Sequence, residues 1–391
     1  MVPPLPEKVL RPGPAAMLER RVGFCALILV ALGLASPGAF AVSTLQSERV
    51  VGAATSAATV GIDYVRSEEF GAKFGLKAQR SPDGKKLTLQ SPWTTIILER
   101  GSREIAHNTL RVFLGEAVRE QRGHFLLSRI DAEKTLVPLL VPGHGLGAGK
   151  GATAPQRETV PKLKTIVIDP GHGGADPGKV NARLGVNEKT MTLDTAKRLQ
   201  SLLEVRGYRV LLTRTADVAL DKDKNTDLRA RAHFANSAQA DLFISLHYNA
   251  VGGSEATLQR VRGAEVYTLT PQYQHSSSDH ERQDSKAAAI ALPGNAHDHW
   301  SMVIAHEVHR ALVHNVGFVD RGLKRARFAV LREVDCPALL VEAGFLSHDE
   351  EARKIATPEY RQQIAEALAT GIVLYDAALE AARRRRPRLA H

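Results

Sequence analysis

The sequence Thr-Ile-Val-Ile-Asp-Pro-Gly-His-Gly-Gly at residues 165–174 decides the fold. Its apolar beginning, 165–169, is typical of a short buried strand. His172 follows the strand, between glycines that would let the backbone pass close to a metal or substrate without Cβ clashes. In open α/β sheets the ligand site lies beyond the carboxyl ends of the strands. His172 is therefore a candidate functional residue.

Strand and helix patterns alternate after this stretch. Strands are expected at 165–169, 209–212, 241–246, 264–269, 328–331 and 338–341, and helices at 187–205, 227–237, 301–313 and 358–379. Such alternation predicts an α/β domain at 164–378, with a mixed, mostly parallel sheet and helices on both faces.

The region before this domain has a different pattern. Short alternating runs broken by turns, with one helix near 67–74, predict a small β-rich domain at 60–141. Its order of elements loosely resembles the stalk-like N-terminal domain of copper amine oxidases. Residues 142–163 are rich in Gly, Ala, Pro and Thr and are expected to form an exposed linker.

The N-terminus carries an export pattern. Arg20 and Arg21 precede the apolar run 22–35, and small residues follow up to Ala41, so residues 1–41 are predicted to be a cleaved signal peptide. The apolar run is shorter than the roughly 20 residues that span a bilayer. We expect an exported, periplasmic or cell-wall-associated protein with no stable membrane span after cleavage. The export route, Sec or twin-arginine, stays open.

The amino-acid composition and net charge indicate which classes of binding partner to expect. Hydrophobic residues make up 43% and charged residues 24%, which is typical of a soluble globular protein. The net charge of +10 includes an arginine cluster in the predicted basic tail, 379–391, and favours anionic partners. For an exported protein these are the cell wall and lipid head groups rather than nucleic acid, although a solvated tail without a partner is equally expected.

Cys336 is expected to be a small buried hydrophobe.

Residues suited to metal chemistry stand at separate strand and helix ends. His172 follows the first strand, Glu188 begins the first helix, His247 ends the third strand, and Glu342 ends the last. Taken singly, such residues are more often structural, and Glu188 is favoured by the helix macrodipole alone. Together, two imidazoles and a carboxylate match a catalytic zinc site, and a further carboxylate could carry the proton for hydrolysis.

These four residues lie within or beside longer sequence motifs. The motifs are at 168–174, 188–189, 245–250, 320–323 and 340–347. With them, residues 165–375 resemble the zinc-dependent N-acetylmuramoyl-L-alanine amidase family of wall hydrolases. The resemblance implies that His172, Glu188 and His247 bind Zn²⁺ and that Glu342 is catalytic. It also implies cleavage of the amide between the lactyl group of muramic acid and L-alanine of peptidoglycan, and it allows for a protein activator. A zinc peptidase cutting within the stem peptide and a non-catalytic wall-binding protein are the alternatives.

Two further segments have candidate roles. One segment, at His306, Glu307 and His309, is similar to the HExxH metalloprotease motif, but its second His comes one residue too early. We therefore expect the two histidines to face solvent or to support packing of their helix. The polar insertion 271–300 is expected beside a catalytic strand end, where a lid and a plain surface insertion are equally expected.

Overall fold

The computed structural model describes residues 48–49, 62–142, 160–277 and 288–385. All of these residues belong to one compact unit, 46–391. The predicted signal peptide lies outside the described residues, as does most of the predicted linker. In the part of the chain that is described, no helix is both long and apolar enough to cross a membrane.

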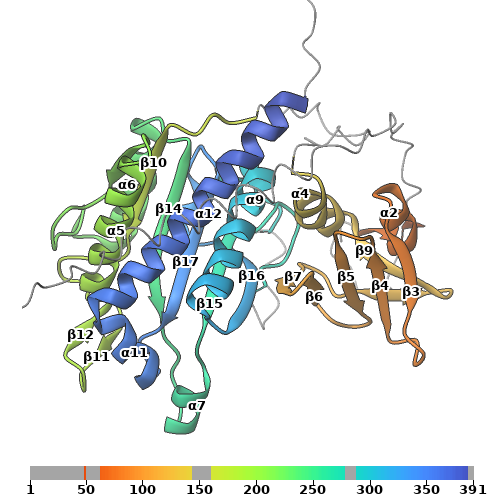
Figure 1. Ribbon diagram of the computed structural model, residues 1–391, viewed down its shortest axis with the longest axis horizontal. Coiled ribbons are helices and arrows are strands. Elements are labelled where there is room, and N and C mark those ends of the chain that lie inside the picture. Colours follow the sequence, from red (N-terminus) through yellow and green to blue (C-terminus); the bar gives the residue numbers. More distant parts are fainter. Residues whose placement is uncertain (1–47, 50–61, 143–159, 278–287, 386–391) are drawn as a thin grey trace, which may run out of the picture. The chain divides into compact units, whose positions relative to one another are not determined.

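The predicted mixed, mostly parallel sheet is present (Figure 1). In spatial order its strands are β13 (Arg209–Leu212), β10 (Thr165–Pro170), β14 (Leu242–Asn249), β17 (Ala338–Phe345), β15 (Ala264–Leu269) and β16 (Asp320–Ala326). The first four are parallel, β15 runs antiparallel to β17, and β16 runs parallel to β15. Every residue of β10 is buried, as expected for a strand covered on both faces.

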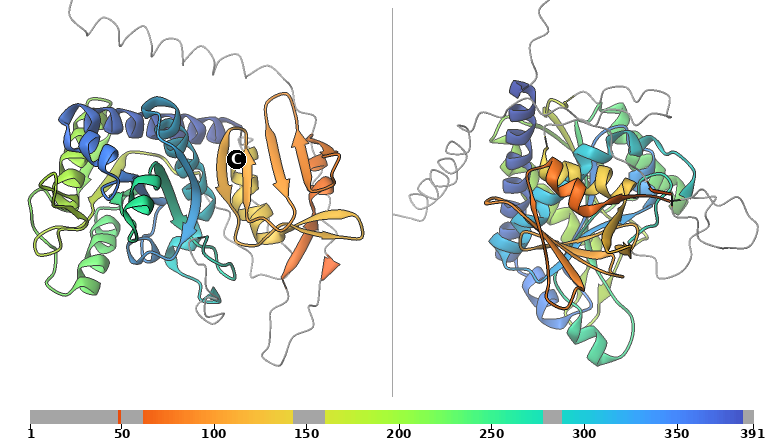
Figure 2. Two further views of the ribbon diagram at one scale, coloured as in Figure 1. Left: turned by 90° about the horizontal axis from the view of Figure 1, so that it is seen from below. Right: turned by 90° about the vertical axis from the view of Figure 1, so that its right-hand side faces the viewer.

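Helices cover both faces of this sheet (Figure 2). On one face lie α5 (Glu188–Glu204), α9 (Asp298–Ala311), α11 (Asp349–Ala356) and α12 (Pro358–Arg385); on the other lie α6 (Lys224–Ser237) and α10 (Ala329–Arg332). The side chain of Asn187 caps α5 by accepting a hydrogen bond from Thr190 N. Because α12 continues to Arg385, the predicted basic tail begins inside a helix.

The prediction for 328–331 was wrong. This apolar stretch lies in the short helix α10 instead of a strand, because a short apolar run fits a buried helix as well as a strand. The edge strand of the α/β region is β16, whose charged sequence carries no strand pattern. Sequence analysis also missed α11 and a short helix α7 (Glu255–Arg260).

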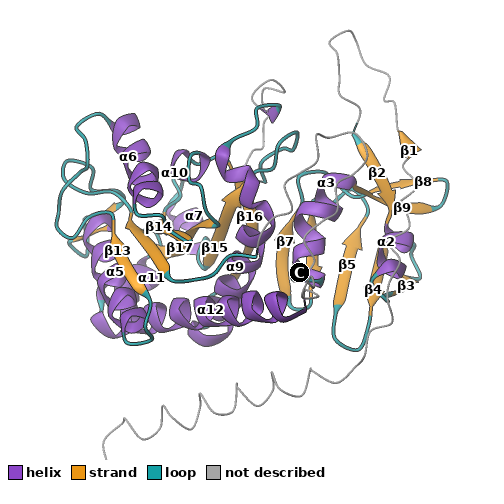
Figure 3. Cartoon of the chain, turned by 90° about the horizontal axis from the view of Figure 1, so that it is seen from above, coloured by secondary structure: helices purple, strands orange, loops and turns teal. Residues whose placement is uncertain are grey.

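The N-terminal region is β-rich, as predicted. Its elements are β1 (Glu48–Arg49), β2 (Asp63–Arg66), α2 (Ser67–Lys73), β3 (Lys77–Arg80), β4 (Lys86–Gln90), β5 (Thr95–Glu99), β6 (Glu104–His107), β7 (Leu110–Phe113), β8 (Arg119–Gln121), β9 (His124–Ser128), α3 (Arg129–Asp131), the π-helical turn Ala132–Leu136 and α4 (Val137–Leu140). Strands β3 to β7 form an antiparallel meander. Strand β7 pairs in parallel with β16, so one 11-stranded sheet runs through both regions (Figure 3).

The expected position of the insertion 271–300 was wrong. Because β15 runs antiparallel to β17, it begins opposite Ala343 and ends toward Ala338, so the insertion leaves the sheet at the end away from the carboxyl ends of β10, β14 and β17. Within it, Pro293–His297 forms a 3-10 turn, and residues 278–287 lie outside the described part. The connection at the carboxyl end of β14 is the one that contains α7.

Candidate active site

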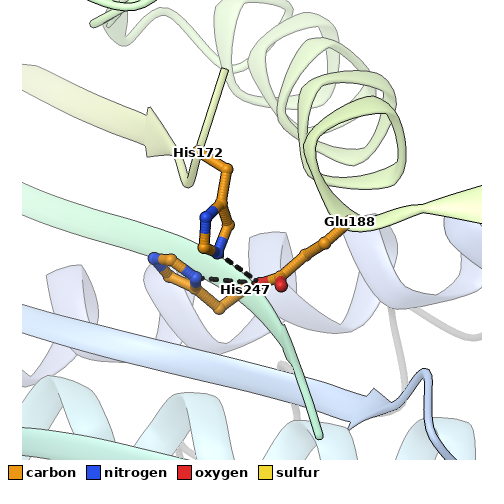
Figure 4. A group of neighbouring side chains, drawn as sticks. All are labelled: His172, Glu188 and His247. Carbon is orange, nitrogen blue, oxygen red and sulfur yellow. Dashed lines mark hydrogen bonds and ion pairs between the residues drawn. The ribbon is translucent and has the colours of Figure 1, made fainter. Parts of the chain in front are cut away.

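Three predicted residues meet at the carboxyl edge of the sheet (Figure 4). His172 lies in the loop after β10, Glu188 is the first residue of α5, and His247 lies near the end of β14. Their ligand atoms all lie within 4.8 Å of one another. Glu188 Oε1 is 3.1 Å from His172 Nε2 and 2.9 Å from His247 Nδ1. Two imidazoles and a carboxylate around one point form a donor set suited to zinc.

Glu188 is fixed by the backbone around it. Its Oε1 accepts a hydrogen bond from Tyr248 N at 3.1 Å, and its Oε2 accepts one from Lys179 N at 2.9 Å. Burial alone would raise the pKa of the Glu188 carboxyl, but the hydrogen bonds and charges of both imidazoles outweigh burial and hold this pKa well below its ordinary value. Glu188 is therefore ionised, as a metal ligand must be.

The loop that carries His172 passes so close to the other ligands that side chains are excluded. A Cβ on Gly171 would lie 2.2 Å from His247 Cε1, and a Cβ on Gly178 would lie 2.5 Å from Glu188 Oε2. His172 itself has φ +64°, a left-handed conformation uncommon for a residue with a side chain. The predicted need for glycine in this loop is thus explained at Gly171 by the ring of His247.

Two buried arginines donate hydrogen bonds to the backbone carbonyls of the same loop. Arg231 donates to Asp169 Oδ1 at 2.9 Å and to the carbonyl of His172 at 2.9 Å. Arg214 donates to the carbonyls of Pro170 and Gly171, each at 2.9 Å. Sequence analysis missed both arginines. The signal that could have found them is Asp169, a carboxylate in an otherwise apolar strand that needs a buried partner.

Glu342 stands beside the three candidate ligands on the next strand. It is in register with His247 across the parallel pair β14 and β17. Its Oε2 is buried and has no hydrogen-bond partner among the described residues. Burial, followed by the charges of Glu188 and Glu265, raises the pKa of the Glu342 carboxyl well above its ordinary value. This environment suits a group that takes up a proton.

The remaining candidates lie away from this site. His309 is fully buried and its Nε2 lies 2.7 Å from Asp320 Oδ1, while His306 Nε2 lies 3.3 Å from Nδ1 of His107 in the N-terminal region. The histidine pair thus supports packing instead of facing solvent. Cys336 is buried, which raises the pKa of its thiol and agrees with a structural role.

Comparison with known proteins places residues 166–373 in a family described as N-acetylmuramoyl-L-alanine amidase. A sporulation-specific N-acetylmuramoyl-L-alanine amidase of Bacillus subtilis is 34% identical over 209 residues, which are 53% of this chain and 66% of that protein. The AmiC amidase of Escherichia coli is 31% identical over 229 residues, covering 54% of this chain and 52% of its own.

A solved N-acetylmuramoyl-L-alanine amidase of Nostoc punctiforme matches 55% of this chain and 97% of its own, with 32% identity and a TM-score of 0.43. An uncharacterised cell wall amidase of Bacillus anthracis is 32% identical, and the match covers 35% of it. This chain thus spans between 35% and 66% of the length of these curated relatives. The family match covers more than half of the present chain. The chain belongs to the N-acetylmuramoyl-L-alanine amidase family.

Proposed function

We propose that this protein is a zinc-dependent peptidoglycan amidase that hydrolyses the amide between the lactyl group of muramic acid and L-alanine of the stem peptide. His172, Glu188 and His247 would hold the metal. Bound there, zinc would polarise the scissile carbonyl and lower the pKa of a water molecule to about 7. The observation that carries the proposal is the convergence of three ligand atoms beside the in-register carboxyl of Glu342.

The chain's own groups supply the proton transfers. Glu342 Oε2, which lacks a partner among the described residues, accepts the proton of the attacking water and then donates it to the leaving amine of L-alanine. The raised pKa of this carboxyl favours holding the proton between the two steps. Arg231 and Arg214 position the carbonyls of the His172 loop, so that His172 keeps its orientation toward the metal.

Export to the periplasm or cell wall belongs to the same proposal, because peptidoglycan lies outside the cytoplasm. It is supported by the pattern at 1–41. The arginines near the C-terminus are proposed to favour the anionic wall. The need for a protein activator stays a prediction.

The test uses purified sacculi and the chain from Val42, the first residue after the predicted cleavage. We expect one zinc per chain, loss of activity with a chelator and recovery with added zinc. Mass spectrometry of the products should find stem peptides beginning at L-alanine and intact glycan strands. Cleavage only between stem amino acids would instead assign a peptidase, and full activity of the metal-free protein would remove zinc from the proposal.

A further inference from the structure

Strand β16 contains a β-bulge where it passes Glu265 of β15. Ala264 is opposite Asp320 and Val266 is opposite Leu323, so Arg321 and Gly322 together face one residue of the neighbouring strand. Gly322 has φ +99°, which a residue with a side chain would adopt only with strain. In a regular strand, residues three apart point to opposite faces. The bulge instead lets Arg321 and Lys324 reach the same carboxylate.

Glu265 is almost completely buried, and its hydrogen-bonding capacity is filled. Its Oε1 accepts from Arg321 Nε at 2.7 Å and from Lys324 Nζ at 2.8 Å. Its Oε2 accepts from Tyr267 Oη at 2.6 Å and from Asn249 Nδ2 at 3.0 Å. Two cations therefore surround one carboxylate, which leaves the cluster with an excess positive charge.

The cluster lies next to the proposed catalytic carboxyl. Glu265 is in register with Glu342 on the adjacent strand, and Glu342 is in register with His247 on the strand beyond. Paired residues on neighbouring strands point to the same face of a sheet. A row thus runs across one face from the candidate metal ligands through Glu342 to Glu265 and Arg321.

The guanidinium of Arg321 is held in place by contacts on one side, but not all of its N–H groups have hydrogen-bond partners among the described residues. Its Nε binds Glu265, and its Cζ lies 5.0 Å from the ring centroid of Phe345. A second bulge, in β17, brings Phe345 opposite Asn249 and places this ring beside the row. The terminal amino groups of Arg321 have no hydrogen-bond partner among the described residues, and 29% of the side chain is exposed. A guanidinium anchored by its Nε presents the geometry for planar recognition of a carboxylate.

We propose that Arg321 is a specificity-determining residue that binds a free carboxylate of the stem peptide, and this inference rests on the proposed function. Glu342 would protonate the leaving amine, so the peptide side of the scissile amide faces Glu342. Continuing along the row away from the metal ligands, the cation that is more exposed is Arg321, with 29% of its side chain exposed against 14% for Lys324. The nearest carboxylate in the stem is that of the residue after L-alanine, which is a free acid in some cell walls and an amide in others.

The test compares two muramoyl peptides that differ only in this group, as the free acid and as the amide. For the unmodified protein, kcat/KM should be roughly 10- to 100-fold higher for the acid, the usual size of a hydrogen-bonded contact with a charged group. Arg321→Gln should remove this preference by slowing hydrolysis of the acid, while the amide is cut at nearly the original rate. Arg321→Lys keeps the positive charge but loses the planar pair of N–H donors that can bind both oxygens of a carboxylate, so it should retain part of the preference for the acid.

Arg262→Gln is the matched control. It removes an arginine just before β15, at the same end of the sheet, where its partner is the exposed Glu350. The preference for the acid should survive this change. Zinc content and circular dichroism verify that each variant folds.

A parallel measurement separates this inference from the proposed function. The released peptide, as acid and amide, is titrated into the zinc-loaded protein by calorimetry, and binding of the acid should weaken in Arg321→Gln. If no muramoyl peptide is hydrolysed but the acid still binds through Arg321, the proposed function fails and the carboxylate site stands. An unmodified protein that treats acid and amide alike in both measurements, or an Arg321→Gln variant that slows both substrates equally, overturns the inference.

Discussion

At the scale of single residues, the environment of Glu342 makes a sharp prediction. Its Oε2 is buried without a partner among the described residues, and three candidate ligands for zinc already stand beside it. Glu342→Gln keeps the shape of the side chain but cannot accept a proton. We expect zinc content and the melting temperature to stay nearly unchanged while kcat falls by about 10²- to 10⁴-fold, the usual contribution of a general base.

Zinc content and kcat are measured on the same preparation of this variant. Loss of zinc in Glu342→Gln would make Glu342 a ligand and return Glu188 to consideration as the proton carrier. A near-normal rate with zinc retained would refute the proposed mechanism.

At the scale of secondary-structure elements, Asp169 ties β10 to its neighbours. It accepts hydrogen bonds from Thr213 after β13, Ser245 of β14 and Arg231 of α6. Asp169→Asn removes the charge that balances the buried Arg231. The free energy of unfolding, measured in urea on the zinc-free protein, should fall by about 3–5 kcal/mol, as for other broken buried ion pairs. Asp335→Asn, in an exposed pair with His297, should cost less than about 1 kcal/mol.

The ion pair between Asp169 and Arg231 also predicts how the stability of the folded protein changes with pH. Burial would raise the pKa of Asp169, but Arg231 and the two hydroxyl groups outweigh burial and lower it. A lowered pKa in the folded state adds stability that is fully present above the unfolded value, about 3.9, and is lost as pH falls through the folded value. Stability should therefore fall more steeply below about pH 4 in the unmodified protein than in Asp169→Asn. Parallel pH profiles of the two proteins would contradict this role.

At the scale of the whole described molecule, strands β3 to β7 of the N-terminal region belong to the same sheet as the α/β strands, while β1, β2, β9 and β8 form a separate sheet. Arg111 N donates to Asp320 Oδ2 at 2.7 Å, and the buried Arg325 donates to the carbonyl of Lys134 at 2.5 Å. Phe113 covers the bulge of β16, because a Cβ on Gly322 would lie 2.5 Å from its ring. We infer that the N-terminal region braces the strand that carries Arg321.

This bracing can be measured by dividing the chain. Residues 62–142 and 160–385, co-expressed as separate chains, should copurify as one complex. Residues 160–385 alone should melt at a lower temperature, because β16 becomes an unpaired edge and Nη2 of the buried Arg325 loses its partners Lys134 and Thr135. Separate elution of the two parts, together with an unchanged melting temperature, would show that the regions are independent.

The sequence by itself determined the α/β pattern and the residues that converge at the carboxyl edge of the sheet. An apolar strand such as 165–169 is a local pattern, and so is a His or Glu directly after a strand or at a helix start. His172, Glu188, His247 and Glu342 could be selected because parallel strands bring their carboxyl ends to one edge whatever the details of pairing.

Only the tertiary structure decided which side chains share a face and which strands are neighbours. Simple alternation would place Arg321 and Lys324 on opposite faces, and the bulge that unites them depends on the pairing of β16 with β15. The antiparallel direction of β15, which sends the insertion to the far end of the sheet, is equally invisible in the sequence. Strand register and direction arise from contacts between residues far apart in the chain, and no local pattern encodes them.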